Sequence, residues 1–466
     1  MGAGVSVGKV APSRRVACDL LGDIRRRDAR ARDLMRESPK LAKLDERDRG
    51  LAMRIVLGVT AAVGFLDERI DVRLRGRTKL EPQVRDALRL SSYELLFLDT
   101  PASVAVSQGV EVVRGVRPRA AGLANAVLRR VADEDVLARK AALARVSDVA
   151  MSRLSFDGNG RSEASPTAAL DDLAWASGYP AWLLERMGDV RTDVARAATE
   201  PPPVYVAANL AKHDDEETRF LLTSAGLEPQ ACDVEGAYRL DRPAGLVRSG
   251  LVEGADVVVA DLSAQRVVSR LPVKPGMRVL EVGQGRGTKS VLLQSMALRA
   301  GGSAQVVGID SVGFKVKVAA ERMVRAGLKD AVTCLEFDAC ALASSAALPA
   351  LLAEPFDLVF VDAPCSGTGT MRRHPEIPWT LTSEDVTSLA RLQLRIIRAV
   401  SSRVRPGGAL CYATCSLLQE ENEDVVEAFL ASAEGANFVL EGSPLRTHPI
   451  VSGPDGHFMA TLNRQE

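Results

Sequence analysis

Apolar residues recur every three or four positions between residues 13 and 135, which is the spacing of helices that each bury one face. The clearest shared faces are formed by Val84, Ala87, Leu88, Leu95 and Leu98, and by Leu123, Ala126, Val127 and Val131. Pro101 suits the start of a further helix, because the first helical turn does not use the N–H that proline lacks. The pattern predicts an all-α bundle over residues 13–140.

The pattern changes after this region. Residues 148–165 contain Asp-Gly-Asn-Gly and several serines, which predict a flexible linker or a surface insertion. Residues 175–187 have helical spacing, and PPPVYVAAN (201–209) predicts a strand that is entered through prolines. We therefore predict a small α+β domain over residues 166–255.

Strands alternate with helices in the last part of the chain. The strands that we predict are RVLEV (278–282), AQVVGID (304–310), a strand before Asp338, DLVFVDAPC (357–365) and GGALCYATCS (407–416). Such alternation is typical of a parallel sheet covered by helices on both faces. We predict a Rossmann-like α/β domain over residues 256–466, with strand order 3-2-1-4-5, making the chain a multidomain protein.

Composition narrows the class of protein. With 466 residues, 46% of them hydrophobic, and no apolar run near the ~20 residues of a membrane span, we expect a cytoplasmic protein without a membrane partner. The start, MGAGVSVGKVAPSRR, lacks the apolar segment of a secretory signal. Seven cysteines without CxxC spacing and four dispersed histidines predict reduced thiols and no metal site. Nothing in the sequence demands more than a monomer.

The zero net charge conceals an uneven distribution. Residues 1–132 contain 26 Lys and Arg against 16 Asp and Glu, so the rest of the chain has the opposite excess. A basic module suggests a polyanionic partner. A run of arginines at helical spacing has two interpretations, because such side chains can follow phosphates or simply face water. The run consists of Arg25, Arg26, Arg27, Arg30 and Arg32.

Glycines and acids follow the predicted parallel strands. GQGRGTK (283–289) lies between a strand and a helix, where backbone N–H groups can approach a ligand, although many such turns contain glycine for steric reasons. Asp310 ends the second strand, where nucleoside-binding sheets hold ribose hydroxyls, and Asp338 at the next strand tip could reach an adenine edge. Either aspartate could instead cap a helix.

Two cysteines end the fourth and fifth strands of this sheet, Cys365 and Cys415. Those strands are neighbours in the predicted order, so we expect both thiols at one site, although free cysteine also packs as a small hydrophobe. A thiolate that adds to C6 of a pyrimidine makes C5 nucleophilic toward an electrophilic methyl group, and a second thiol can help remove the C5 proton. Asp362 could hold the ring by hydrogen bonds. The remaining cysteines, which we expect to be packed, are Cys18, Cys232, Cys334, Cys340 and Cys411.

Several motifs resemble bacterial ribosomal RNA cytosine-C5 methyltransferases of the Sun/RsmB type. These motifs are VDAPCSGTGTMRRHPEIPW, YATCSLLQEENE and DGHFMATL. The first domain resembles the NusB-type RNA-binding module through LEPQVRDALRLSSYELLFLD and AGLANAVLRRVA. The resemblance implies that the protein methylates C5 of a cytosine in 16S ribosomal RNA. The substrate would be a cytosine in a single-stranded loop or one flipped out of a helix.

The resemblance also implies roles for individual residues. Cys415 would attack C6, Cys365 would assist release of the methylated base, and Asp362 would orient the cytosine. S-adenosyl-L-methionine would lie over the glycine loop, with its ribose near Asp310 and its adenine near Asp338. The loop residues are Gly283, Gln284, Gly285, Arg286, Gly287, Thr288 and Lys289, and the RNA side of the pocket would involve Arg372, Arg373 and His374.

The glycine loop departs from the pattern that the resemblance leads us to expect. Family members typically have Cys-Ala-Ala-Pro-Gly-Gly-Lys, whereas this chain has Arg286 in place of the proline and Thr288 in place of a glycine. Two hypotheses follow. The chain is an active RNA cytosine-C5 methyltransferase, or it is an RNA-binding ribosome-assembly factor whose methyltransferase domain is degenerate.

Overall fold

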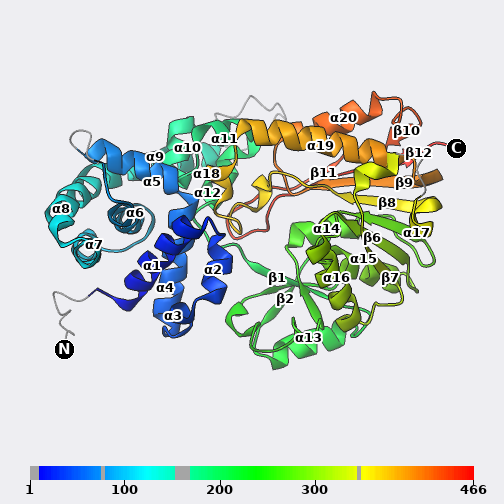
Figure 1. The fold of residues 1–466 in the computed structure, drawn as a ribbon, viewed down its shortest axis with the longest axis horizontal. Helices are drawn as coiled ribbons and strands as arrows, with labels where there is room; N and C mark the ends of the chain where they lie inside the picture. The colour runs from blue at the N-terminus through cyan, green and yellow to red at the C-terminus, as the bar shows by residue number, and fades with distance from the viewer. Residues whose placement is uncertain (1–9, 75–78, 153–167, 344–347) are drawn as a thin grey trace. The chain divides into compact units, whose positions relative to one another are not determined.

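The computed structural model describes residues 10–74, 79–152, 168–343 and 348–466 (Figure 1). The chain forms two compact units, one made of residues 1–200 and 371–381, the other of residues 201–370 and 382–466. Among the described residues, no single helix is long and apolar enough to cross a membrane, although helices Glu46–Ala61 and Val63–Arg73 together pass that test as a pair bent by 80°.

The first unit is helical, as its apolar spacing predicts. Its α-helices are α1 (Pro12–Arg27), α2 (Ala31–Glu37), α3 (Pro39–Ala42), α4 (Glu46–Ala61), α5 (Val63–Arg73), α6 (Pro82–Phe97), α7 (Ala102–Val116), α8 (Ala121–Arg130), α9 (Val136–Ser152), α10 (Leu170–Ser177), α11 (Ala181–Arg186), α12 (Arg191–Ala197) and α18 (Ile377–Thr380). Helix α6 packs against α1, α4, α5, α7 and α8, and it is seen end-on among its neighbours in Figure 1. It therefore forms the centre of this core.

Three predictions for this region need correction. Residues 175–187 do not form one helix, because Gly178 adopts φ +77° and separates α10 from α11. Residues 148–152 continue α9 instead of beginning a linker, and residues 153–165 lie outside the described ranges. On α8, Ala126 is exposed, so the prediction of a buried Ala126 was wrong.

Arginines of this unit neutralise buried acids on α6. Glu94 is fully buried, and Arg14 donates to both of its carboxylate oxygens over 2.7 and 2.9 Å. Asp86 is buried and accepts from Arg25 at 2.9 Å and from Arg89 at 3.0 Å. A buried carboxylate is tolerated when it is paired and hydrogen-bonded. Some of the arginines in the basic region therefore pair with buried acids of the helical core. The sequence interpretations, in which arginines follow phosphates or face water, did not include this role.

The second unit begins with a small antiparallel sheet. Its strands are β1 (Val204–Ala208), β2 (Pro229–Ala231), β3 (Ala237–Leu240) and β4 (Val257–Val259), in the order β2-β3-β1-β4. Helix α13 (Asp215–Ser224) precedes β2, and its N-terminus has a capping box in which Asp214 and Glu217 each accept a backbone N–H of the other. The strand predicted from PPPVYVAAN is present as β1.

A larger mixed sheet follows. Its strands are β5 (Arg278–Val282), β6 (Gln305–Asp310), β7 (Val332–Glu336), β8 (Phe356–Asp362), β9 (Val404–Thr414), β10 (Phe438–Leu440), β11 (Leu445–Arg446) and β12 (Phe458–Arg464). The path β7-β6-β5-β8-β9 is parallel and confirms the predicted order 3-2-1-4-5, and β12 and β10 continue it in antiparallel fashion. The carboxyl ends of the parallel strands therefore meet at one edge.

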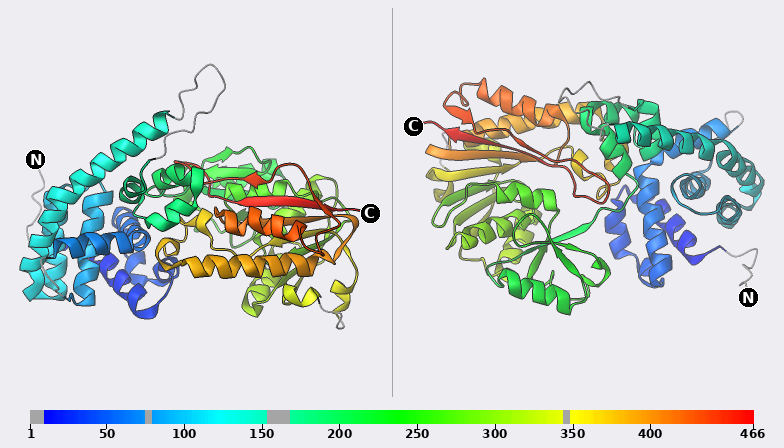
Figure 2. Two further views of the ribbon diagram at one scale, coloured as in Figure 1. Left: turned by 90° about the horizontal axis from the view of Figure 1, so that it is seen from above. Right: turned by 180° about the vertical axis from the view of Figure 1, so that it is seen from behind.

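Helices cover both faces of this sheet (Figures 1 and 2). The helices are α14 (Leu262–Ser269), α15 (Thr288–Arg299), α16 (Gly313–Arg325), α17 (Ala350–Ala353), α19 (Ser383–Ser401) and α20 (Glu423–Leu430). One hydrophobic core joins α14, α15 and α16 to the sheet, and a second joins α19 and α20 to the opposite face. The fold class predicted for this region, a Rossmann-like α/β domain, is confirmed.

Residues 371–381 belong to the first unit although both flanking segments belong to the second. The indole N–H of Trp379 donates to the carbonyl oxygens of Ala61 and Gly178, over 2.9 and 3.1 Å. A Cβ at Gly64 would lie 2.2 Å from the Trp379 ring, so only glycine leaves room for the indole. Trp379 thus anchors this segment in the helical core.

Replacing this anchor should destabilise the helical unit. We expect Trp379→Ala to lower the free energy of unfolding by about 2–4 kcal/mol, because a large packed ring is lost. Trp379→Phe should lower it by only about 1 kcal/mol, because a ring remains and the two hydrogen bonds are lost. Denaturant unfolding followed by far-UV circular dichroism measures both. Equal stability of Trp379→Ala and the wild type would contradict this role.

Candidate active site

The two cysteines that end neighbouring parallel strands lie in contact. Cys365 follows β8 by three residues and Cys415 directly follows β9, and the register pairs Asp362 with Ala413. The two Sγ atoms are 3.3 Å apart. The structure therefore brings together the two thiols that the sequence placed on separate strands.

A lysine and an aspartate lie beside these thiols. Asp362 ends β8, and Lys289 is in the first turn of α15, where its Nζ donates to Asp362 at 2.6 Å. Burial by itself lowers the pKa of Lys289, but the charge of Asp362 and the hydrogen bond to it outweigh burial and raise it. The lysine is therefore an ammonium at neutral pH.

The two thiols differ in acidity. The pKa of Cys415 is lowered because the hydrogen bond that Cys365 donates to it outweighs the raising effects of burial and of the charge of Asp362, and the positive charge of Lys289 acts in the lowering direction. The same hydrogen bond, together with burial, raises the pKa of Cys365 well above its ordinary value. By contrast, burial raises the pKa of Cys18 and Cys411 to about 12. Since the thiolate is the nucleophile, Cys415 is the sulfur suited to attack.

The glycine loop passes the same edge of the sheet. Gly283, Gly285 and Gly287 have φ values of +79°, +60° and +75°, which side chains other than glycine rarely adopt. A Cβ on Gly283 would be 2.2 Å from the carbonyl oxygen of Asp362, so the loop can approach β8 only with glycine there. Arg286 is exposed, and Thr288 accepts a hydrogen bond from Arg322. The changed residues are thus accommodated in a regular strand-loop-helix turn.

A buried acid lies beneath this loop. Glu281 is fully buried in β5 and accepts from Ser290 Oγ at 2.5 Å, and Gln284 donates to that hydroxyl at 3.0 Å. Burial, opposed by the hydrogen bond from Ser290, raises the pKa of Glu281 to about 8. Gln284, predicted as a cofactor contact, therefore directs its side chain into the buried interior. In the sequence, Glu281 differs only mildly from the aspartate that the resemblance leads us to expect at the end of this strand.

The other predicted acids have backbone partners. Asp310 accepts from the N–H groups of Gly285 at 3.0 Å and Val312 at 2.9 Å, so it ties the glycine loop to the end of β6. Asp338 is exposed and accepts from the N–H of Cys340 at 2.9 Å, which is the capping alternative considered from the sequence. Each carboxylate retains acceptor capacity for a ligand hydroxyl or amine.

The three residues expected on the RNA side of the pocket, Arg372, Arg373 and His374, are in the segment assigned to the first unit. There, Arg32 donates hydrogen bonds to the backbone carbonyls of Arg372 and Arg373. Burial lowers the pKa of His374. These hydrogen bonds from Arg32 lie within the helical unit.

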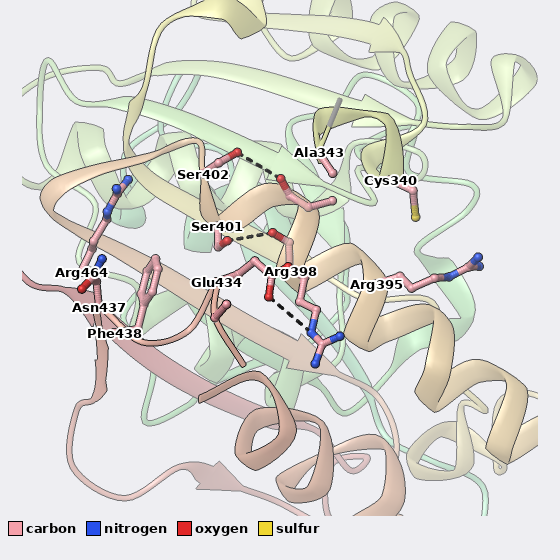
Figure 3. A pocket seen from close by; sticks show the side chains of 12 residues that line it. Cys340, Ala343, Arg395, Arg398, Ser401, Ser402, Glu434, Asn437, Phe438 and Arg464 are labelled. Carbon is pink, nitrogen blue, oxygen red and sulfur yellow. Dashed lines mark hydrogen bonds and ion pairs between the residues drawn. The ribbon is translucent and has the colours of Figure 1, made fainter. Parts of the chain in front are cut away.

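A cavity of about 550 Å³ lies elsewhere in the second unit (Figure 3). Its lining includes Arg395 and Arg398 of α19, Cys340 and Phe438, and neither thiol of the close pair lines it. Within the described ranges, no cluster of His, Cys, Asp and Glu has the arrangement of a metal site. The chemistry-bearing groups are those at the carboxyl edge of the large sheet.

Parts of the chain match known protein families, and nearly the whole chain is similar to a curated relative. Residues 268–462 match the family described as 16S rRNA methyltransferase RsmB/F, and residues 11–133 match the NusB family. The chain is 29% identical over 438 residues to ribosomal RNA small subunit methyltransferase B of Klebsiella pneumoniae, covering 91% of this chain and 92% of that protein.

Solved structures share the fold. The crystal structure of PH0851 superposes with a TM-score of 0.72 at 20% identity, covering 98% of this chain and 100% of that one. NSun6 from Pyrococcus horikoshii, determined with SFG, superposes with a TM-score of 0.52 at 19% identity, covering 62% of this chain and 99% of that one. At these identities the likeness shows the architecture.

The protonated state of Glu281 predicts a pH-dependent stability. Its pKa in the fold, about 8, exceeds its ordinary value of 4.5, so the native state holds a proton that the unfolded state releases. Stability should therefore fall as pH rises from about 4.5 to 8. Glu281→Gln mimics the neutral acid and should be the more stable protein at pH 8, by about 1–3 kcal/mol.

Urea unfolding of the wild type and Glu281→Gln at pH 5, 6.5 and 8 measures this effect. The pH 5 data are the internal control, because Glu281 is largely neutral in the fold there and the two proteins should differ least. Parallel stability curves across this range would show that Glu281 is already ionised in the native state.

Proposed function

We propose that the chain methylates C5 of a cytosine in ribosomal RNA, because residues 268–462 match the family described as 16S rRNA methyltransferase RsmB/F and residues 11–133 match the NusB family. The methyl donor is S-adenosyl-L-methionine. The observation that carries the proposal is the contact of Cys365 and Cys415, with 3.3 Å between the sulfurs, beside Asp362 and Lys289.

The thiol pair suits a reaction in which a covalent bond forms and is then broken. The thiolate of Cys415 attacks C6 of the cytosine, and the electron pair displaced from the C5–C6 bond makes C5 the nucleophile that accepts the methyl group. Loss of the C5 proton restores the double bond and expels the thiolate. Cys365 assists that release. Its raised pKa keeps it protonated while Cys415 is a thiolate. Once Cys365 has released its own proton to solvent, its thiolate is a strong base that accepts the C5 proton.

Lys289 and Asp362 prepare the site for this chemistry. The ammonium of Lys289 favours the thiolate form of Cys415. Asp362 has one oxygen bound to Lys289 and can use its other oxygen to accept a hydrogen bond from the exocyclic amine of a cytosine. An acid held by a lysine keeps a fixed direction, which is what orientation of a flat base requires.

The residues at the sheet edge fit a nucleoside-type cofactor. The positive-φ glycines of the loop leave its backbone uncovered by side chains, and the acids Asp310 and Asp338 follow the next two strands. We propose that loop residues 283–289 hold S-adenosyl-L-methionine, with Asp310 at the ribose and Asp338 at the adenine. Bound there, the cofactor supplies the electrophilic methyl group.

The RNA partner is proposed from chemistry and family together. A cytosine inside a helix hides C5 and C6 from a protein thiol, so the substrate must be a single-stranded loop or a flipped nucleotide. The basic excess of residues 1–132, beyond the arginines used in internal ion pairs, supports phosphate contacts by the helical unit. We propose that the protein acts as a monomer.

One observation favours the alternative of a binding factor without activity. The side chain of Gln284 is turned into the buried interior, and Arg286 introduces a charge into the loop proposed to hold the cofactor. Such a protein would bind RNA without using the thiols. The retained trio of Cys365, Cys415 and Asp362 has no explanation in that case.

Methyl transfer tests the proposal directly. Labelled S-adenosyl-L-methionine is incubated with undermethylated small-subunit ribosomal RNA and either wild type or Cys415→Ala. We expect label on cytosine C5 with wild type and a rate at least about 10³-fold lower with Cys415→Ala. Cofactor affinity measured by calorimetry is the control. Wild type that binds RNA but neither binds millimolar cofactor nor transfers label would be the inactive binding factor.

The two cysteines should also differ in covalent trapping. Cys365→Ala should accumulate a protein–RNA adduct, because the bond to C6 forms and its release is slowed, whereas Cys415→Ala should form none. Denaturing electrophoresis with labelled RNA detects the adduct, and Cys411→Ala is a matched control that removes a buried thiol outside the pair. An adduct in Cys415→Ala that is absent from Cys365→Ala would reverse the assigned roles.

A further inference from the structure

A buried glutamate lies directly behind the thiol pair. Glu421 ends a short 3-10 turn, η7 (Gln419–Glu421), and is fully buried. Its carboxylate accepts hydrogen bonds from neutral donors, and within the described ranges no cation pairs with it. Burying a carboxylate without a cation is costly unless every acceptor site is used. A residue retained at that cost invites a functional explanation.

Two of the residues that donate to Glu421 directly follow the two cysteines. One carboxylate oxygen accepts the backbone N–H of Ser366 at 2.8 Å. The other accepts the hydroxyl of Ser416 at 2.6 Å and also the hydroxyl of Ser366. The two serine hydroxyls are 3.2 Å apart. A single carboxylate therefore joins the position after Cys365 to the position after Cys415.

Further bonds make this connection rigid. Gln393 of α19 donates to Glu421 at 3.0 Å and to the carbonyl oxygen of Pro364 at 2.9 Å, so residues on both sides of Cys365 are held. Thr368 lies 3.2 Å from the Ser416 hydroxyl and accepts the N–H of Leu417 at 2.9 Å. The loops after β8 and β9 are thus joined by side chains beyond the point where strand pairing ends.

Strand pairing alone does not determine where the two sulfurs lie. The paired residues end at Asp362 and Ala413, and Cys365 lies three residues beyond the last of them. A loop of that length has many conformations, and a fixed geometry has to come from contacts outside the ladder. Two backbone hydrogen bonds hold the loops beyond the ladder, from the N–H of Ala363 to Ala413 and from the N–H of Gly369 to Cys415, each over 2.9 Å. Glu421 and its partners add the side-chain contacts on either side of Cys365.

We propose that Glu421 is a positioning residue that holds the two thiols at reacting distance by clamping Ser366 and Ser416. The proposal rests on the function proposed above, in which one sulfur attacks the base and the other assists release. Glu421 itself touches neither sulfur in that scheme. Its effect is to keep Cys365 where it can serve the adduct formed by Cys415.

Disulfide closure measures the separation of the thiols without any requirement for activity. The oxidant diamide takes two electrons and two protons from Cys365 and Cys415 and becomes a hydrazine, while the sulfurs form one bond. Peptide mapping by mass spectrometry locates the bond among the seven cysteines. The variants are Glu421→Ala, Glu421→Gln and Ser416→Ala. Gln294→Ala is the control, because it removes a buried hydrogen-bonding side chain from α15 at the amino ends of β6 and β7.

We expect Glu421→Ala to slow closure by about tenfold or more, because displacement of a group by about 1 Å has effects of that size or larger. Glu421→Gln should stay within about threefold of wild type, since its carbonyl accepts from Ser366 and its amide can donate to the serine hydroxyls. Ser416→Ala should slow closure by about threefold, because one of the clamp's donors is lost. Gln294→Ala should close at the wild-type rate.

Methyl transfer with the same variants separates this inference from the proposed function. We expect Glu421→Ala to lower kcat with KM unchanged, and Glu421→Gln to restore most of it, a pattern that general destabilisation does not produce. If the wild type transfers no methyl group but Glu421→Ala still forms the disulfide slowly, the proposed methyltransferase function is wrong and the positioning role of Glu421 stands. If Glu421→Ala forms the disulfide at the wild-type rate, the positioning role of Glu421 is wrong. Should Glu421→Ala not fold, a wild-type rate in Ser416→Ala would lead to the same conclusion.

Discussion

The parallel pairing of β8 with β9 is the constraint on which the rest of the site depends. Two strands that run in the same direction and end together place the segments after them side by side, and here both segments carry a thiol. The lysine from α15 reaches the same edge because the glycine loop turns tightly against β8, with room for no side chain at Gly283. In such a site the paired strands fix where the functional side chains lie, and the segments after the strands carry the reactive groups.

Burial has opposite consequences in the two units. In the helical unit, buried Glu94 and Asp86 are each paired with an arginine, so the core contains neutralised charge. In the second unit, Glu281 and Glu421 are buried beside hydroxyl groups, and no cation of the described residues forms an ion pair with either. The arginine-paired acids are compatible with a stable helical bundle, whereas Glu281 and Glu421 lie near the proposed active site, where the protonation of side chains affects reactivity. Arginine content alone therefore overstates the basic surface available to RNA.

Much of the architecture could be predicted because its signals are local. Apolar spacing identified the helical unit, strand-helix alternation identified the parallel sheet, and the order of its strands placed Cys365 and Cys415 as neighbours. The errors occurred where one residue overrode a regional pattern: Gly178 broke a helix that the flanking residues favoured. The prediction of Gln284 as a ligand contact came from its place in the loop, which gave no indication that its side chain donates to a buried hydroxyl.

By itself, the sequence determined the fold class, the two motif cysteines and the acids at the strand tips, because periodicity and motif order are properties of adjacent residues. Only the tertiary structure decided which groups share a hydrogen bond. The clamp of Glu421 joins residues 55 and 5 positions away from it in the chain, and the shifted acidities of Cys365 and Cys415 come from their contact. Distances of a few ångströms between remote segments arise from packing, which no local pattern records.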